Sequence, residues 1–302
     1  MKLFVYIILN IININMIINK INILITIIII IIIIIILIII IKLNTSKEPN
    51  VILPYNVVVV GCARDISKYL STTKEKLQMI QKMFKTCKII IYENDSSDTT
   101  LEILKKWENE GFIKLITEKN ISGLRTERLS HGRNILYKEA MKCDFDYFIV
   151  TDMDDVISKL SYKAIMTCFD TTEDWAMVGA NQTCYYYDIW ALRTIDDWLP
   201  FDCMYCNHIE NKGFKYCIGS RIKNIPYNSS MIEVKSCFGG FGIYKRKYLD
   251  NCSYGNGIQS NTMQSTSIQS KDMQSKSMEI CEHVTFNNCV TNNGGKIYIN
   301  PK

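Results

Sequence analysis

The chain has 302 residues, a formal net charge of +5 at pH 7 and twelve cysteines. Its length fits one large domain or two small ones. The charge is modest and includes no long basic block, so the pattern of a nucleic-acid-binding protein is excluded. The cysteines are scattered, and their one close pair, Cys203 and Cys206, is not enough to indicate a zinc site.

The N-terminal part of the chain predicts a transmembrane helix. Residues 21–41 carry no charged side chain and are almost all isoleucine. A helix rises about 1.5 Å per residue, so this segment spans roughly 30 Å, the thickness of a bilayer core. The run is too long for a cleaved signal peptide, and no small-residue cleavage site follows it. We therefore predict a tail at 1–20 and a retained single-pass anchor at 21–41, whose flanking lysines do not decide its orientation.

Beyond the anchor, a linker precedes alternating strands and helices. Residues 42–54 contain Pro49 and Pro54 and predict the linker. Apolar runs predict strands at 55–60, 87–92, 112–117, 145–151 and 176–180. Helical spacing predicts helices at 74–84, 100–107 and 131–141. This alternation predicts an α/β domain over 55–302, with a mostly parallel sheet flanked by helices.

The predicted strand that ends at Thr151 is followed by Asp152, Asp154 and Asp155. In open α/β sheets, ligands bind just beyond the carboxyl ends of the strands. Carboxylates at that place can hold a divalent cation, which in turn can hold a diphosphate. In the Asp-x-Asp pair, one carboxylate can take the metal while the other reaches a ribose or a metal-bound water. The alternative is an Asp-rich turn or helix cap.

Polar residues also follow the first two predicted strands. Arg64 and Asp65 follow the first strand, and Glu93 and Asp95 follow the second. In a nucleotide-binding sheet these positions face the base and ribose, where carboxylates accept hydrogen bonds. The alternative is turn and capping chemistry, which we prefer for the adjacent Ser97–Asp98 segment.

Three later segments contain further candidates. Arg133 and Asn134 lie in a predicted helix, where a guanidinium and backbone N–H groups suit phosphate oxygens. Asp188 lies inside the aromatic run 185–190, whose rings either stack on sugars or pack in the core. His283 is one of three histidines, and a neutral imidazole often joins carboxylates in a metal site, although a buried core histidine is the alternative.

The interval 257–278 is a repeat in which an isoleucine or methionine recurs every five residues. A period of five matches neither a helix face nor a strand face. We therefore predict a low-complexity loop insertion. It separates Cys252 from Cys281 in the sequence, and we expect the segments on its two sides to lie close in space.

In chain order, these segments resemble a nucleotide-sugar-dependent glycosyltransferase of the GT-A type. The matching pieces are Arg64–Asp65, residues 92–100, Arg133–Asn134, Asp152–Asp154, residues 187–190, the glycine-rich run 238–244 and His283. Residues 93–100 (Glu-Asn-Asp-Ser-Ser-Asp-Thr-Thr) and 187–193 (Tyr-Asp-Ile-Trp-Ala-Leu-Arg) most resemble the fungal capsule-associated alpha-1,3-mannosyltransferases. The resemblance covers roughly residues 56–300.

The resemblance implies a GT-A (Rossmann-like) fold and Mn²⁺ or Mg²⁺ held by Asp154, with Asp152 and His283 as further ligands. It also implies that a GDP- or UDP-sugar donor binds at Arg64, Asp65, Glu93, Asp95, Arg133, Asn134 and Asp152. A hexose, with mannose as one candidate, would pass to a glycan or glycoprotein acceptor. In a eukaryotic secretory pathway this anchored domain would lie in the lumen of the Golgi or endoplasmic reticulum.

The resemblance leaves the stereochemistry open. An inverting enzyme needs a carboxylate base near the acceptor hydroxyl, and the candidates are Asp188, Glu233 and Glu282. A retaining enzyme needs no such base. Asp155, the third carboxylate after the strand, makes the register of the metal ligands ambiguous.

Two other functions compete with this one. A sugar-phosphate nucleotidyltransferase also has a parallel sheet with metal-binding carboxylates. However, it needs a glycine-rich, basic triphosphate loop after the first strand, and residues 61–65 lack one. A non-catalytic, membrane-tethered sugar-binding or scaffold protein would bind no nucleotide in a metal-dependent way.

Overall fold

The computed structural model describes residues 20–39, 51–182, 185–204, 214–255, 258–259 and 278–302. The chain divides into two compact units, Met1–Val51 and Ile52–Lys302. In the first unit, the helix Lys20–Ile39 is long and apolar enough to cross a membrane. The last two residues of the predicted anchor, 40 and 41, lie outside the described residues.

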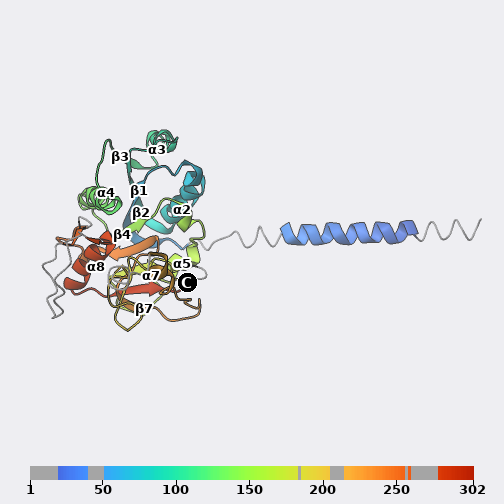
Figure 1. Cartoon of the computed structure of the whole chain (residues 1–302). Coiled ribbons are helices and arrows are strands. Elements are labelled where there is room, and N and C mark those ends of the chain that lie inside the picture. The colour runs from blue at the N-terminus through green and yellow to red at the C-terminus, as the bar shows by residue number, and fades with distance from the viewer. Residues whose placement is uncertain (1–19, 40–50, 183–184, 205–213, 256–257, 260–277) are drawn as a thin grey trace, which may run out of the picture. The chain divides into compact units, whose positions relative to one another are not determined.

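The second unit is built on a nine-stranded sheet with the order β3-β2-β1-β4-β8-β5-β11-β7-β6 (Figure 1). Its strands are β1 (Leu53–Ala63), β2 (Phe84–Asn94), β3 (Lys114–Glu118), β4 (Tyr147–Thr151), β5 (Met177–Ala180), β6 (Arg193–Thr194), β7 (Ile232–Ser236), β8 (Phe241–Lys245) and β11 (Ile297–Asn300). The strands from β3 to β4 are parallel. Next to them, β8 is antiparallel to both β4 and β5, and β7 is antiparallel to β11 and β6. The predicted α/β class is confirmed, with a parallel half and a mixed half.

Helices cover both faces of this sheet (Figure 1). One face carries α2 (Leu70–Met83), α3 (Thr100–Asn109) and α5 (Tyr162–Met166), and the other carries α4 (Arg125–Ala140) and α8 (Glu282–Asn292). In β1, Val57 and Val59 belong to the core under α2, α3 and α5, while Val58 and Val60 belong to the core under α4 and α8. A strand buried on both faces reads as a continuous apolar run, so the run 57–60 contains no polar residue.

Strand β1 begins at Leu53, inside the predicted linker. Its pairing with β2 breaks register between Leu53 and Asn56. Pro54 lies in this irregular stretch, where its missing N–H removes no regular ladder bond.

Helix α4 begins at Arg125, six residues before the predicted start at 131. Its first turn is capped by two carboxylates. Glu127 accepts a hydrogen bond from the backbone N–H of Leu124 at 2.6 Å. Glu279 accepts from the backbone N–H and the hydroxyl of Thr126 at 3.1 and 2.7 Å. Because Glu279 is 153 residues from Thr126 in the chain, no local pattern reveals this cap.

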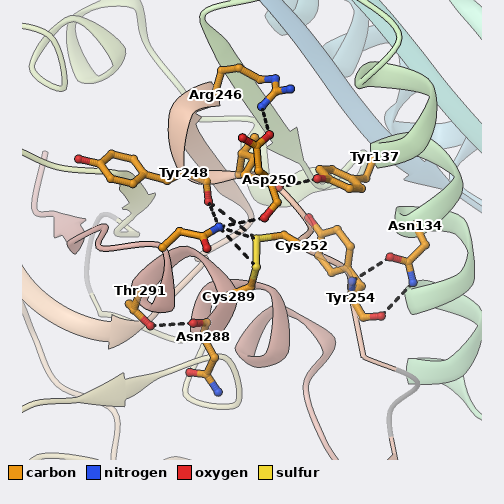
Figure 2. The surroundings of a disulfide bond; sticks show 12 residues. Asn134, Tyr137, Arg246, Tyr248, Asp250, Cys252, Tyr254, Asn288, Cys289 and Thr291 are labelled. Atoms are coloured by element: carbon orange, nitrogen blue, oxygen red, sulfur yellow. Dashed lines mark hydrogen bonds and ion pairs between the residues drawn. A yellow bond between two sulfur atoms is a disulfide. The ribbon is translucent and has the colours of Figure 1, made fainter.

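The segment that precedes the repeat is fastened to two helices (Figure 2). Cys252 forms a disulfide with Cys289 of α8. The amide of Asn134, on α4, donates to the carbonyl of Tyr254 at 2.9 Å and accepts from its N–H at 2.8 Å. On the far side of the segment, β9 (Ile258–Gln259) pairs with β10 (Met278–Glu279). The rest of the predicted loop insertion, 257 and 260–277, lies outside the described residues.

We predict that removing the disulfide destabilises the domain. The two cysteines are 37 residues apart, and constraining a loop of that length in the unfolded chain contributes about 3–4 kcal/mol. The Cys252→Ser/Cys289→Ser variant should lose about that much free energy of unfolding, measured by urea denaturation with tryptophan fluorescence. Reducing agent should destabilise the wild type similarly and leave the variant unchanged. Equal stability of the two oxidised proteins would contradict the prediction.

We also predict that residues 260–277 are dispensable for folding. Gln259 and Met278 lie opposite each other in the β9–β10 pair, so a two-residue Asn-Gly turn can join them. The shorter loop costs less closure entropy, and the replacement should leave the domain as stable as the wild type or up to about 2 kcal/mol more stable. Calorimetric melting checks this. A fall in melting temperature of roughly 2–4 °C or more, which corresponds to about 1 kcal/mol of stability for a domain of this size, would refute the prediction.

Candidate active site

A cavity of about 370 Å³ opens beyond the carboxyl ends of the parallel strands β1, β2 and β4. Its charged lining consists of four arginines (Arg64, Arg125, Arg128 and Arg133) and three aspartates (Asp65, Asp152 and Asp154). Because these strands are parallel, the residues that follow them meet at one edge of the sheet. The cavity therefore gathers five predicted site residues: Arg64, Asp65, Arg133, Asp152 and Asp154.

The turn after β4 presents Asp152 and Asp154 to this cavity. The backbone N–H of Asp152 donates to the carbonyl of Gly240 at 2.8 Å, which fixes the turn against the segment that leads into β8. The carboxylate of Asp154 accepts from the backbone N–H of Val156 at 3.1 Å and caps a short 3₁₀ helix, Asp155–Ile157. Asp155 is exposed and does not line the cavity. The Asp-x-Asp pair thus lines the cavity and Asp155 does not.

Electrostatics around Asp152 favour a bound cation. Burial raises the pKa of its carboxyl to about 7; Arg133 opposes this shift, and the charges of Asp154 and Asp188 add to it. A guanidinium nitrogen of Arg133 lies 3.3 Å from the Asp152 carboxylate. Carboxylates that repel one another are stabilised when a cation binds between them. Asp152 and Asp154 are therefore the carboxylates at this turn that could hold a metal ion.

Arg133 is held by a second carboxylate from the far end of the chain. Its guanidinium donates to Glu282, the first residue of α8, in a pair whose side chains are 7% and 4% exposed. Its guanidinium carbon also lies 5.3 Å from the centre of the Phe238 ring. Glu282, proposed from the sequence as a base, is thus buried and paired, and its geometry is that of a residue that orients Arg133.

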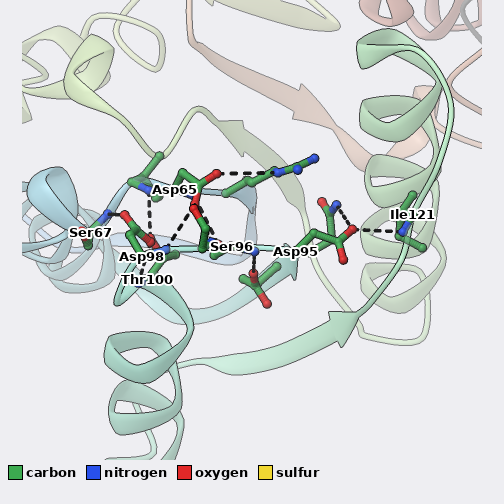
Figure 3. A network of polar contacts seen from close by, with 12 residues as sticks. Asp65, Ser67, Asp95, Ser96, Asp98, Thr100 and Ile121 are labelled. Atoms are coloured by element: carbon green, nitrogen blue, oxygen red, sulfur yellow. Dashed lines mark hydrogen bonds and ion pairs between the residues drawn. The ribbon is translucent and has the colours of Figure 1, made fainter.

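Asp65, Glu93 and Asp95 form hydrogen bonds within the loops around the cavity, and Figure 3 shows those of Asp65 and Asp95. Asp65 accepts a hydrogen bond from the backbone N–H of Ser97 at 2.7 Å, and this bond makes the largest contribution to the lowered pKa of the Asp65 carboxyl. Glu93 is 2% exposed and accepts from the N–H of Ser96 at 2.9 Å. Asp95 accepts from two backbone N–H groups, of residues 120 and 121, at 2.6 and 3.0 Å. Of these three, Asp65 alone lines the cavity.

The last predicted residues lie at different distances from this cavity, and none lines it. Asp188 is close enough for its charge to raise the pKa of Asp152, and it accepts from the N–H of Gly239 at 2.9 Å. Asn134 is occupied by its two bonds to Tyr254. Glu233 lies on β7 and pairs with Lys296 at 3.1 Å. Four strand steps separate β7 from β4, about 19 Å at ~4.8 Å per step.

His283 is a core residue in this structure. It is 2% exposed, and its ring stacks on Phe238 at 3.7 Å between centres. Burial, followed by the charge of Arg133, lowers its pKa well below the ordinary value, so the ring is neutral. Among the described residues, no group of three His, Cys, Asp or Glu side chains is arranged to hold a metal ion. The ring of His283 therefore packs in the core here, and its role as a third metal ligand stays a prediction.

The cavity lining also includes Cys62 and Tyr92, which no sequence pattern marked as ligand-binding candidates. Asn94 and Arg128 line it as well. Asn94 is adjacent to the predicted Glu93, and side chains alternate along a strand, so the residue at this tip that faces the cavity is the asparagine. Tyr187 is also near these carboxylates. Burial raises the pKa of its hydroxyl, and the charges of Asp188, Asp152 and Asp154 raise it further.

The donor set at the turn fits a hard divalent cation. Mg²⁺ and similar ions bind one or two protein carboxylates and complete their coordination with water and substrate phosphate oxygens. Asp152 and Asp154 supply such a pair, and neither is fully buried. The four arginines in the cavity lining offer planar donor forks of the kind that bind phosphate.

Comparisons with known proteins place the chain near several glycosyltransferase structures. No protein-family model matches the chain, and no curated protein matches its sequence. The structure of S. aureus TarS 1–349 is similar at 11% identity and a TM-score of 0.40, covering 81% of this chain and 57% of that one. Mannosyltransferase PcManGT from Pyrobaculum calidifontis, in complex with GDP-Man and Mn²⁺, is similar at 13% identity and a TM-score of 0.35, covering 70% and 52%.

A third similar structure is glucosyl-3-phosphoglycerate synthase from Mycobacterium tuberculosis, with Mn²⁺ and UDP. It shares 13% identity and a TM-score of 0.36, covering 67% of this chain and 62% of that one. The chain thus spans little more than half the length of the solved structures to which it is similar. Similarity at this level assigns neither a family nor an activity.

We predict that Arg133 and Glu282 are energetically coupled. Removing one partner of a buried ion pair leaves the other charge uncompensated, which costs about 3–5 kcal/mol. Glu282→Gln and Arg133→Met should each destabilise the protein by a few kcal/mol, and the double variant should lose less than the sum of the two. Urea denaturation of the four proteins gives the coupling energy. The exposed pair Lys296–Glu233 is the matched control, with an expected coupling of about 0–1 kcal/mol. Additive losses at Arg133 and Glu282 would contradict the prediction.

Proposed function

We propose that the protein is a metal-dependent glycosyltransferase of the GT-A type, which moves a hexose from a GDP- or UDP-sugar to a glycan or glycoprotein acceptor. One observation carries the proposal: Asp152 and Asp154 face the same cavity as four arginines, at the carboxyl edge of parallel strands. Carboxylates that can hold a cation, placed in one cavity with guanidinium groups, are complementary to a metal-bound diphosphate.

Within this proposal the residues of the chain have separate tasks. Asp154 and Asp152 would hold Mn²⁺ or Mg²⁺, which when bound neutralises charge on the departing nucleotide. Arg64, Arg125 and Arg128, which line the same cavity, would contact phosphate oxygens. Arg133, oriented by Glu282, keeps Asp152 in place and offsets the repulsion among the carboxylates.

For an inverting reaction, Asp188 is the strongest candidate base. Its charge raises the pKa of Asp152, so it lies near that carboxylate. Glu282, in contrast, is paired with Arg133, and Glu233 lies on β7, four strand steps from β4. We therefore leave Glu233, Asn134 and His283 out of the proposed chemistry. Asp65 stays a candidate for the nucleotide, and Glu93 and Asp95 are assigned to shaping the loops that surround it.

The setting of the reaction is also a proposal. The apolar helix Lys20–Ile39 would anchor the domain to a membrane as a single span. Mannose is the first hexose to test, because the segments 93–100 and 187–193 resemble those of the capsule-associated mannosyltransferases. The disulfide Cys252–Cys289 supports a luminal or other oxidising compartment for the domain.

We predict Mn²⁺-dependent nucleotide binding that requires Asp154. The full chain in lipid nanodiscs should bind GDP or UDP in the presence of Mn²⁺, measured by isothermal titration calorimetry. Asp154→Asn should weaken this binding by at least about tenfold, since changes even outside a metal's ligand shell cost that much. Asp155→Asn, at the neighbouring exposed carboxylate, is the matched control and should bind like the wild type.

Sugar transfer is then followed with GDP-mannose and other nucleotide sugars. A folded wild type that binds no nucleoside diphosphate would overturn the proposal in favour of a non-catalytic tethered protein. Binding that does not depend on Mn²⁺ would remove the assigned role of Asp152 and Asp154.

A further inference from the structure

A second cavity, of about 230 Å³, lies next to the proposed active site. Its wall is mostly apolar and includes Ile157, Ile165, Val178, Phe241 and Ile243. Four of these five side chains are no more than 3% exposed, and Phe241 is 5% exposed. An apolar cavity of roughly 150 Å³ already binds a benzene-sized molecule, so this one has room for a ring or a short alkyl chain.

The two cavities are neighbours, although no described residue lines both of them. Val156, which lines the second cavity, donates its N–H to the Asp154 carboxylate at 3.1 Å. Gly239, also in its lining, donates its N–H to Asp188 at 2.9 Å. The adjacent Gly240 has no room for a side chain, since a Cβ there would lie 2.2 Å from Val156. Two residues that line the second cavity are therefore hydrogen-bonded to Asp154 and to Asp188, the candidate base.

The polar groups around the second cavity limit what it can hold. Asn181 lines it, and the amide oxygen of that residue is buried without a hydrogen-bond partner among the described residues. An unsatisfied buried acceptor calls for a donor such as a ligand hydroxyl. The charged side chains in the lining are Lys159 and Lys302, and the described lining contains no aspartate or glutamate. The cavity thus suits an apolar group that carries a hydroxyl and is not cationic.

We propose that this cavity binds an apolar aglycone of the acceptor: a hydrophobic ring or chain attached to the sugar whose hydroxyl is glycosylated. The proposal rests on the proposed glycosyl transfer and adds the class of acceptor. The sugar would lie over the Gly239–Gly240 segment, with one hydroxyl toward Asp188 and the apolar group beneath Phe241 and Ile165. An acceptor without such a group would lose the contact with this wall.

The test compares methyl and hexyl mannosides, which differ only in the length of the apolar group. Each methylene moved from water to an apolar site tightens binding about fourfold. We expect the hexyl glycoside to bind the full chain in nanodiscs, with Mn²⁺ and GDP present, at least about tenfold more tightly than the methyl glycoside. Affinities are measured by saturation-transfer NMR titration.

Two variants distinguish binding of the hexyl chain in the cavity from its partitioning into the membrane. Ala164 lines the cavity from α5, so Ala164→Phe should fill it and abolish the chain-length preference. Ala164→Ser leaves it open and should retain the preference. Both should bind Mn²⁺ and GDP like the wild type, because Ala164 does not line the first cavity.

The outcomes distinguish this inference from the function on which it rests. A chain-length preference that survives in Ala164→Phe, or no preference in a wild type that binds the nucleotide, would overturn the cavity assignment alone. A wild type that binds no Mn²⁺–nucleotide would overturn the proposed function and, with it, the acceptor assignment. Loss of preference in Ala164→Phe with intact nucleotide binding supports both.

Discussion

The guanidinium of Arg133 is the interaction on which the carboxylate cluster depends. It contacts Asp152 on one side and Glu282 on the other, and it is itself 7% exposed. A buried cation between two carboxylates is stable only while both are present, since burying a lone charge is costly. The turn that carries Asp152 and Asp154, the start of α8 and the middle of α4 are therefore held together by one set of ion pairs.

The rest of the domain can be understood as the support for these ion pairs. Parallel pairing of β1, β2 and β4 brings the ends of three strands together, and β8 fixes the turn after β4 through the carbonyl of Gly240. On the other face, the Cys252–Cys289 disulfide and the bonds between Asn134 and Tyr254 tie α8 to α4. The Gly240 bond restrains the turn that carries Asp152, and the contacts between α8 and α4 restrain Glu282. Apart from Asp152 itself, none of the residues that make these contacts lines the cavity.

The sequence predicted those parts of the structure that follow from local patterns. Buried strands are continuous apolar runs, so the strand ends at Ala63, Asn94 and Thr151 could be located to within about three residues, and the carboxylates 152 and 154 were identified with them. Partnerships between distant residues were not predictable: Arg133 and Glu282 are 149 residues apart. His283 shows the same limit, because nothing in its neighbours reveals that its ring stacks on Phe238 inside the core.

The position of the β9–β10 pair has a consequence for variation of the gene. The repeat has a period of five residues, and its two ends are paired with each other in β9 and β10. Repeats of this kind gain and lose whole units when DNA is copied. Units added or removed between β9 and β10 would leave this pair in place, so alleles with different copy numbers would share one α8 position and one Arg133 partner.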